Sequence, residues 1–326
     1  MKKISSIITL AFLLLLGSLM SFASDLIIES KTQSYAEEES KIKFDGDVKV
    51  RIDDLHVVSD RADVSVINGE KLDTATFYDK PYAYENKTNK KREVKANILK
   101  VSLIKKTVRA EGDTQTIVFD GKVPIAVINA DEQEYNTKTG IMTAKGNISI
   151  TYKDIKAFSD YGEFKTDKNG DLKDLLLSGN AIVKNEGNEV HADKITYNDR
   201  SNFFIATGKT STKGVNKDGH VLMIYADKQE YNGVTGLYNA MGNVKVYYED
   251  YFAEGPKVAV YSDKTTNKPH EIYFVGRSSI SQGPRTIYAD KIMIVTEPKN
   301  FKAVGNTRTV IKNITEHGDS DMGLGL

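Results

Sequence analysis

The sequence predicts an all-β protein of repeated antiparallel strands, and three observations support this prediction. Apolar and polar residues alternate with a period of two in many short segments. Clusters of turn-forming residues separate these segments. The composition is typical of a β protein, with 17 Tyr, 24 Gly and only 6 Pro in 326 residues. Beyond residue 23 no 3.6-residue apolar period continues for three turns, so we expect essentially no helix there.

The N-terminal segment has the layout of a secretory signal peptide. Lys2 and Lys3 precede an apolar stretch over residues 7–20, and Ser21 and Ala23 then place small residues at the two positions that a signal peptidase inspects. We expect cleavage after Ala23 and export to the periplasm. An uncleaved anchor in the inner membrane is the alternative, although the apolar stretch is shorter than the roughly 20 residues that a spanning helix needs.

An internal repeat is the strongest signal in the chain. Residues 130–152 (ADEQEYNTKTGIMTAKGNISITY) match residues 226–248 (ADKQEYNGVTGLYNAMGNVKVYY) at a constant offset of 96. A more diverged copy lies upstream, where Tyr35 and Gly46 stand 100 residues before Tyr135 and Gly146. Repeats of this kind predict repeated structural units. We therefore expect a leader (1–23), three modules (24–123, 124–220 and 221–314) and a disordered tail (315–326).

Within each module, strand segments show clear alternation. Residues 48–52 (VKVRI) and 244–248 (VKVYY) alternate apolar with basic or aromatic residues, and residues 194–197 (KITY) alternate before a turn. Successive side chains of a strand point to opposite faces, so each strand has one apolar face. Burying these faces requires two curved layers that enclose an apolar trough.

A shorter unit recurs inside the modules, in which Ala-Asp, once Ala-Asn, is followed 15 residues later by Gly. The pairs are Asn97/Gly112, Asp131/Gly146, Asp193/Gly208, Asp227/Gly242 and Asp290/Gly305. Gly tolerates the backbone angles of a bend or bulge, and Asp accepts backbone hydrogen bonds in turns. We interpret these residues as structural corners, because active sites are seldom copied several times along one chain.

Catalytic and metal-binding patterns are missing from the sequence. The five His residues are scattered, Cys is absent, and no phosphate loop or nucleophile elbow occurs. Residues 167–171 (DKNGD) resemble the start of a calcium loop, but Gly stands at the fourth position and Ser178 replaces the bidentate Glu. We expect a hairpin turn there, no metal, no cofactor and no enzymatic activity.

Charge gives little support to nucleic-acid binding. Loss of the leader with its two Lys leaves 43 basic against 45 acidic residues. The basic run at residues 87–92 (KTNKKR) looks like a solvated loop inserted in the first module, and contact with anionic lipid headgroups is the alternative.

The repeated units resemble a known family. The patterns A-D-x-x-x-Y and A-x-G-N-V-x-V in residues 226–248, and A-D-K-I in residues 192–197 and 289–294, are similar to the OstA-like (organic solvent tolerance-like) family of periplasmic lipopolysaccharide-transport proteins. The likeness covers nearly all of 26–314 and is weakest in the first module. It implies a curled, half-open β-jellyroll, or β-taco, that holds lipopolysaccharide acyl chains between its layers and joins inner-membrane and outer-membrane transport components through strand edges.

Three modules make this chain longer than the typical soluble member of that family. It could therefore form more of the bridge by itself or associate head to tail, and its cargo could be a related glycolipid. The alternating apolar residues are the candidates for lining the lipid groove: Val48, Val50, Ile148, Ile150, Ile182, Ile195, Tyr197, Phe203, Ile205, Val244, Val246, Tyr248, Ile292 and Ile294. A closed core would use the same residues, so the sequence leaves both interpretations open.

Two other classes of protein fit the pattern less well. A structural or adhesive β-repeat protein of the cell envelope would share the scaffold but have a closed core without lipid. A carbohydrate-active enzyme would need a cluster of carboxylates in one groove. The sequence shows no sign of such a cluster.

Overall fold

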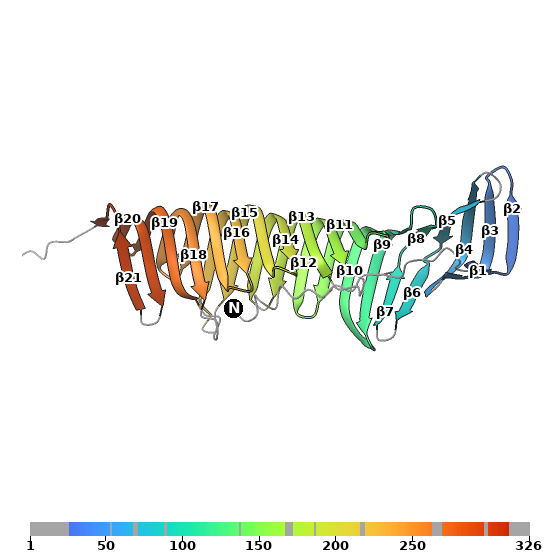
Figure 1. Ribbon diagram of the computed structural model, residues 1–326, viewed down its shortest axis with the longest axis horizontal. Helices are drawn as coiled ribbons and strands as arrows, with labels where there is room; N and C mark the ends of the chain where they lie inside the picture. Colours follow the sequence, from blue (N-terminus) through green and yellow to red (C-terminus); the bar gives the residue numbers. More distant parts are fainter. Residues whose placement is uncertain are drawn as a thin grey trace, which may run out of the picture.

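The protein is a long antiparallel β-sheet that curls across its width (Figure 1). The computed structural model describes residues 26–52, 54–67, 71–87, 90–136, 138–166, 172–185, 187–215, 219–262, 269–296 and 299–312. Over these residues the chain forms 22 strands in a single sheet and no helix. The predicted all-β, curled architecture is therefore confirmed.

The strands follow one another along the long axis in the order of the chain, from β1 and β2 at one end to β20 and β21 at the other (Figure 1). Their bounds are β1 Leu26–Glu29, β2 Thr32–Ala36, β3 Lys41–Ile52, β4 Leu55–Ile67, β5 Lys71–Tyr78, β6 Tyr82–Lys87, β7 Lys90–Lys95, β8 Ile98–Ser102, β9 Thr107–Asp120, β10 Val123–Asn136, β11 Ile141–Tyr152, β12 Ile155–Thr166, β13 Leu172–Asn185, β14 Asn188–Asn198, β15 Phe203–Val215, β16 Val221–Asn232, β17 Leu237–Tyr248, β18 Tyr251–Ser262, β19 Pro269–Gln282, β20 Arg285–Thr296, β21 Lys299–Val304 and β22 Arg308–Ile311.

The chain crosses the width of the sheet many times, and we call each crossing a pass. Most passes are one long strand, and a few are split into two short strands. β1 and β2 both pair with β3, and β21 and β22 both pair with β20. In the same way β4 pairs with β5 and β6, and β9 pairs with β7 and β8. Each split falls at mid-pass, where the unsplit strands show a shift of pairing register. For example, the β11–β12 register shifts between Lys145 and Ile148.

These mid-pass irregularities form a line along the molecule that we call the corner. On β11 the corner residues Gly146 and Asn147 both have positive φ angles, of 72° and 46°. Such a bulge bends the strand and increases its twist. The corner divides the sheet into two layers. Layer A consists of Ile148–Tyr152 and the segments that pair with it, directly or through neighbouring strands. Layer B consists of Ile141–Lys145 and the segments that pair with it in the same way.

The apolar sides of the two layers face each other and form the core. Buried residues group into an N-terminal cluster from Phe44 to Ala110, a middle cluster from Val118 to Tyr231 and a C-terminal cluster from Ile224 to Ile292. Half-buried Val94 and Val108 pack against both the N-terminal and middle clusters, and Tyr238 packs against both the middle and C-terminal clusters. The core therefore continues along the whole sheet.

One expectation about the connections between strands is wrong, and three expectations fall outside the described residues. The basic run 87–92 is not a solvated loop, because Lys87 ends β6, Lys90 begins β7 and the Arg92 side chain is buried. The leader (1–23), the tail (315–326) and the turn at 167–171 lie outside the part that the structure describes. Within that part, no helix has the length and apolar character needed to cross a bilayer.

Candidate functional site

The candidate site is the apolar interior between layers A and B. Eight of the residues expected to line it are buried there: Val48, Val50, Ile148, Ile150, Ile195, Tyr197, Val244 and Ile292. Val246 and Ile294 are half-buried and pack against the C-terminal cluster. Tyr248 is half-buried and shares the inward side of its strand with Val244 and Val246.

Three expected lining residues lie on the outer face of the sheet instead. Ile182 is half-buried between buried Ala181 and Val183, so it points away from the core. Phe203 and Ile205 flank Phe204, which packs against the middle cluster, and Ile205 precedes buried Ala206.

Local sequence explains both errors. In β13 odd-numbered residues face inward on both sides of the bulge at Gly179, since Leu175, Leu177, Ala181 and Val183 are all buried. Ala181 and Val183 stand two and four residues after Gly179, as Ile148 and Ile150 do after Gly146, so Ile182 falls on the outer face. In β15 the run Phe203–Phe204–Ile205 contains no polar residue that would mark the outer face. The alternation therefore does not predict which of these side chains face the interior.

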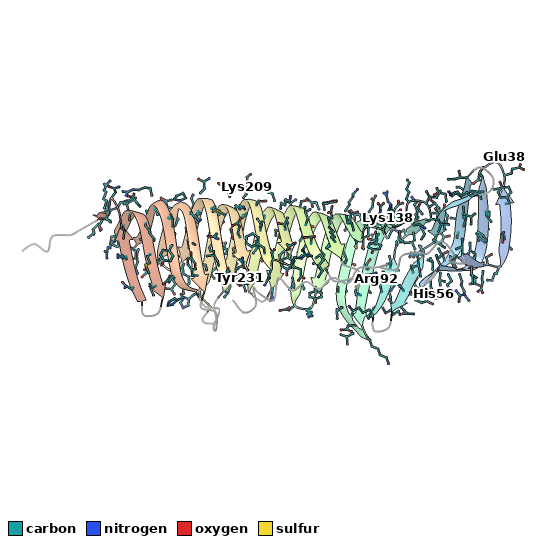
Figure 2. The ribbon with its side chains drawn as sticks, in the orientation of Figure 1. Glu38, His56, Arg92, Lys138, Lys209 and Tyr231 are labelled. Atoms are coloured by element: carbon teal, nitrogen blue, oxygen red, sulfur yellow. The ribbon has the colours of Figure 1, made fainter. Side chains whose placement is uncertain are left out.

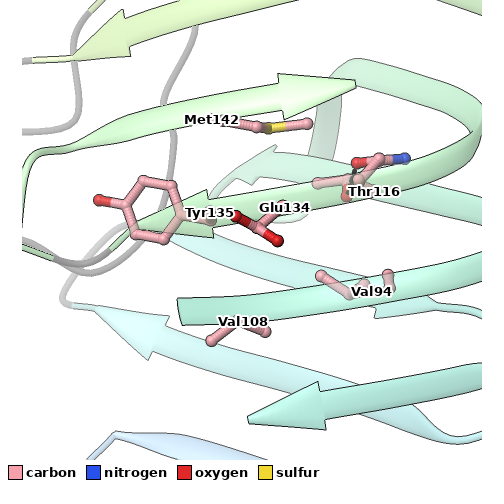
Figure 3. A pocket seen from close by; sticks show the side chains of 8 residues that line it. Val94, Val108, Thr116, Glu134, Tyr135 and Met142 are labelled. Carbon is pink, nitrogen blue, oxygen red and sulfur yellow. Dashed lines mark hydrogen bonds between the residues drawn. The ribbon is translucent and has the colours of Figure 1, made fainter. Parts of the chain in front are cut away.

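The middle of the interior is filled by the protein's own side chains. A cavity of about 30 Å³, room for about one water molecule, lies where the N-terminal and middle clusters meet. Val94, Val108, Thr116, Glu134, Tyr135 and Met142 are among the residues that line it (Figure 3). This volume is too small for an acyl chain, so the interior is closed at this point.

The interior is more open in the C-terminal section, which we define as residues 221–312. Ile150 and Tyr152 are only 1% and 3% exposed, whereas Val246 and Tyr248, at the equivalent positions 96 residues later, are half-buried. Two further pairs of equivalent positions differ in the same way: Ala126 and Ile155 are buried, whereas Leu222 and Tyr251 are half-buried. All four positions lie in layer A, near or at its hairpin turns. The rim of layer A therefore exposes apolar side chains in the C-terminal section that the middle of the molecule buries.

A buried polar network crosses the interior next to the corner. The Gln133 Nε2 group donates to Thr114 Oγ1 (2.8 Å) and to the Ile128 carbonyl (3.2 Å), while Thr116 Oγ1 donates to Gln133 Oε1 (2.7 Å). Thr116 belongs to layer A and Gln133 to layer B, so these bonds hold the layers together. Because each polar atom has a partner, the network avoids the cost of an unsatisfied buried group.

The same network recurs 96 residues later around Gln229. Thr212 donates to Gln229 Oε1, Tyr238 Oη donates to the same oxygen at 2.7 Å, and Gln229 Nε2 donates to the Ile224 carbonyl. Burial raises the pKa of the Tyr238 phenol, so it stays protonated as a donor. We missed both networks in the sequence, although the 96-residue spacing of Thr114/Thr210, Thr116/Thr212 and Gln133/Gln229 marks them.

An ion pair lies in the interior between the N-terminal and middle clusters. Arg92 Nη1 of β7 is 3.7 Å from Glu85 Oε2 of β6, and both side chains are almost fully buried. Burial lowers the pKa of Arg92, while the charge of Glu85 opposes that shift. Figure 2 labels Arg92 within the strands that lead into the middle of the sheet. This pair places two charged side chains inside the otherwise apolar interior, near the cavity.

The expected corner residues meet in pairs across neighbouring strands. A Cβ atom added to Gly146, Gly208, Gly242 or Gly305 would lie within 3 Å of a carboxylate oxygen of Asp131, Asp193, Asp227 or Asp290, respectively. The Asp partner is a side-chain amide: Asn147, Asn243 and Asn306 each donate to the facing Asp at 2.7–3.0 Å. Lys209 takes the place of this Asn beside Gly208 and points outward from the corner (Figure 2). These contacts give the Asp residues a role in bending the strands.

The titratable residues do not converge on a reaction centre in the part of the chain that the structure describes. Within that part, no group of three or more His, Cys, Asp or Glu side chains is placed to hold a metal ion. The geometry instead offers an apolar interior, partly exposed at one rim, and two sheet edges.

No family model matches the sequence, and no curated protein matches it either. Among solved structures, the chain is similar to the crystal structure of LptH from Pseudomonas aeruginosa, described as the LptA-homologous periplasmic component of the lipopolysaccharide transport device. The identity is 13%, the match covers 57% of this chain and 94% of LptH, and the TM-score is 0.19. At these values the likeness carries no functional information, which has to come from the geometry of the interior.

Proposed function

We propose that this chain is a non-enzymatic periplasmic carrier that binds the acyl chains of lipopolysaccharide, or of a related glycolipid, and passes the lipid towards the outer membrane. The observation that carries the proposal is the half-open rim of the C-terminal section. Leu222, Val246, Tyr248 and Tyr251 are inward-facing apolar or aromatic side chains that the rest of the core leaves partly uncovered. The proposal also draws on the family resemblance of residues 226–248.

The driving force for binding would be the hydrophobic effect. Each CH₂ group that moves from water into an apolar interior gains about 0.8 kcal/mol. A headgroup would stay in water beyond the rim, and no bond would be made or broken. Opening the layers further would separate the half-buried side chains of the C-terminal section before the fully buried ones of the middle. We therefore place the acyl chains between the layers of residues 221–312.

The two ends of the sheet suit edge-to-edge assembly with a second copy or with membrane-bound transport components. Within the described residues, β1 and β2 pair only with β3, and β21 and β22 pair only with β20. At one edge Tyr35 is 56% exposed opposite Ile42, and at the other Phe301 is 41% exposed opposite Ile294. Because Ile42 and Ile294 pack against the core, both edges display apolar side chains in line with the interior.

The alternation of corner residues from one pass to the next would also continue across such an edge-to-edge contact. The last pass carries Gly305 and Asn306, which face Asp290 on the preceding strand. The first pass carries Lys31 at the place of the facing Asp, against Gly46 and paired with Asp47 at 2.7 Å. A first pass added to a last pass would therefore continue both the antiparallel order and the corner, through main-chain hydrogen bonds.

A closed-core structural protein of the envelope remains the second candidate, because the interior is packed through the middle of the molecule. The deciding experiment is native mass spectrometry with lipid extraction, on protein purified from the periplasm of a lipopolysaccharide-producing host. We expect a bound lipid that is lost in Val246→Asp, because this substitution places a carboxylate on the half-open rim.

The matched control is Val275→Asp, which makes the same change on the exposed outer side of β19 in the same section. It should retain the lipid and the far-ultraviolet circular dichroism of the wild type. Folded wild-type protein that stays lipid-free when lipopolysaccharide is added would reject the carrier and favour the structural role.

A further inference from the structure

The β17–β18 hairpin carries aromatic side chains on both sides of the layer A rim. Tyr248 and Tyr251 point inward at the half-open interior, whereas Tyr247 and Phe252 lie on the outer face. The Tyr247 and Phe252 rings have centroids 4.8 Å apart, and Tyr225 of β16 meets Tyr247 edge-on at 6.0 Å. We call Tyr225, Tyr247 and Phe252 the outer aromatic platform.

The platform is specific to the C-terminal section and is not required by the scaffold. Its equivalents 96 residues earlier are Asn129, Thr151 and Lys156, which occupy the same outer rows of layer A. The same backbone thus folds with small or polar side chains at these positions. Tyr225 and Tyr247 nevertheless leave 42% and 43% of their surface exposed to water. Exposed aromatic side chains gathered in one place are typical of a binding surface.

Charged side chains of both signs lie beside the platform. Lys245 pairs in register with Tyr225, and Lys213 pairs with Met223, which is itself opposite Tyr247. Both lysines are exposed. On their other neighbouring strands, Lys245 lies in register with Glu254 and Lys213 with Glu189. The platform is therefore an aromatic surface with a polar border of mixed charge.

The other exposed aromatic pair of this section lacks these properties. Tyr261 and Tyr273 meet edge-on at 5.7 Å on the outer face of layer B. There, Lys291 covers the Tyr273 ring at 4.7 Å and the Tyr273 hydroxyl donates to Glu271. This pair is already partnered by the protein and provides a matched control.

We propose that the outer aromatic platform binds the saccharide headgroup of the amphiphile whose acyl chains enter the C-terminal section. The negative face of an aromatic ring attracts the weakly positive C–H groups on one side of a sugar ring. Lys213 and Lys245 would donate hydrogen bonds to hydroxyl or phosphate oxygens of the headgroup. A headgroup that leaves the interior between Tyr248 and Tyr251 needs only to turn over the rim of the same hairpin to reach Tyr247 and Phe252. The assignment of the headgroup to this amphiphile rests on the proposed carrier function.

The test uses a deacylated, phosphorylated oligosaccharide that has no acyl chains. Binding to the full chain is followed by calorimetry and by tyrosine fluorescence, which is not masked because the protein contains no Trp. In the double variant Tyr225→Asn/Tyr247→Thr, which takes the residues found at positions 129 and 151, we expect affinity to fall by about tenfold or more. Lys213→Gln/Lys245→Gln should weaken binding mainly at low salt. Tyr261→Thr should bind as the wild type does.

The outcomes separate this inference from the proposed function. Equal binding by wild type and the Tyr225→Asn/Tyr247→Thr variant overturns the platform. So does a wild type that binds acylated lipid but not the oligosaccharide, although the carrier function then stands. A variant that changes self-association and leaves oligosaccharide affinity intact assigns the surface to a second copy and also overturns it. Oligosaccharide binding without lipid binding supports the platform and rejects the carrier.

Discussion

At the scale of single residues, the corner glycines meet two separate demands. Gly146 has a φ of +72°, which costs side-chain-bearing residues about 1–2 kcal/mol. A Cβ atom there would also lie 2.1 Å from Asp131 Oδ2, far inside van der Waals contact. Backbone angle and space both favour Gly, which explains why the residue recurs at most copies of the corner, although Asp79 and Lys80 adopt the positive φ angles at the β5–β6 split.

We expect Gly146→Ala to lower the free energy of unfolding by about 2–4 kcal/mol, from backbone strain and the displaced Asp131 carboxylate. Gly121→Ala is the control, because Gly121 has a φ of +58° but no atom within 4 Å of an added Cβ. The control should lose only the backbone contribution of about 1–2 kcal/mol. Urea unfolding followed by circular dichroism measures both, and equal losses would show that the Asp131 contact is unimportant.

At the scale of elements, neighbouring strands are joined at the corner by one polar contact per pair. In four copies an Asn next to the Gly donates to an Asp on the preceding strand, as Asn180 does to Asp160 at 3.0 Å. The copy at Gly112 reverses the two residues: Asn97 stands on the preceding pass and Asp113 follows Gly112, with 3.5 Å between Asn97 Nδ2 and Asp113 Oδ2. In the copy at Gly46, Lys31 takes the place of the amide and pairs with Asp47 at 2.7 Å. The carboxylate of the contact can therefore stand on either strand, and its partner is an amide or a lysine.

Asn97→Asp alone should destabilise the protein by about 0.5–1 kcal/mol, because two carboxylates would face each other across the strands. Adding Asp113→Asn should restore stability, since it recreates the arrangement of Asp131 and Asn147. A double-mutant cycle in urea measures this coupling. If the double variant is no more stable than Asn97→Asp, the contact does not join the strands in this way.

At the scale of the whole molecule, the sheet is a linear stack in which each pass contacts mainly its neighbours. The apolar interior runs through this stack and reaches both terminal edges, at Tyr35 and Phe301. Exposed edges of this kind either recruit another strand or aggregate. Continuity of the corner between the last and first passes favours ordered, head-to-tail recruitment.

We predict that the protein self-associates with rising concentration and that Phe301→Lys shifts this equilibrium towards the monomer by at least about tenfold. A charge at Phe301 would have to be buried against the incoming edge, which is costly. Analytical ultracentrifugation measures the effect, and Val275→Lys, on the outer face of β19, is the control. Equal association by wild type and Phe301→Lys would exclude the C-terminal edge as the contact.

Much of the lining of the interior was predictable, but not all of it. Val48, Val50, Ile148 and Ile150 follow Gly corners and alternate cleanly with polar residues, so their inward direction could be read directly. Ile182 was misplaced because it lies three residues after Gly179, whereas the inward positions are two and four residues after a corner Gly, as at Ile148 and Ile150. Arg92 was misplaced because a basic run usually lies in water, and its burial depends on Glu85 across the β6–β7 hairpin.

By itself, the sequence determined the all-β class, the repeat and the corner positions, because each depends on local periodicity or on a residue type demanded by one backbone angle. Only the tertiary structure decided how open the interior is. Ile150 and Val246 occupy equivalent positions in the repeat, yet one is buried and the other half-buried. That difference comes from the packing of whole layers against each other, to which residues distant in the chain contribute together. The periodicity of a single strand does not contain information about this difference in exposure.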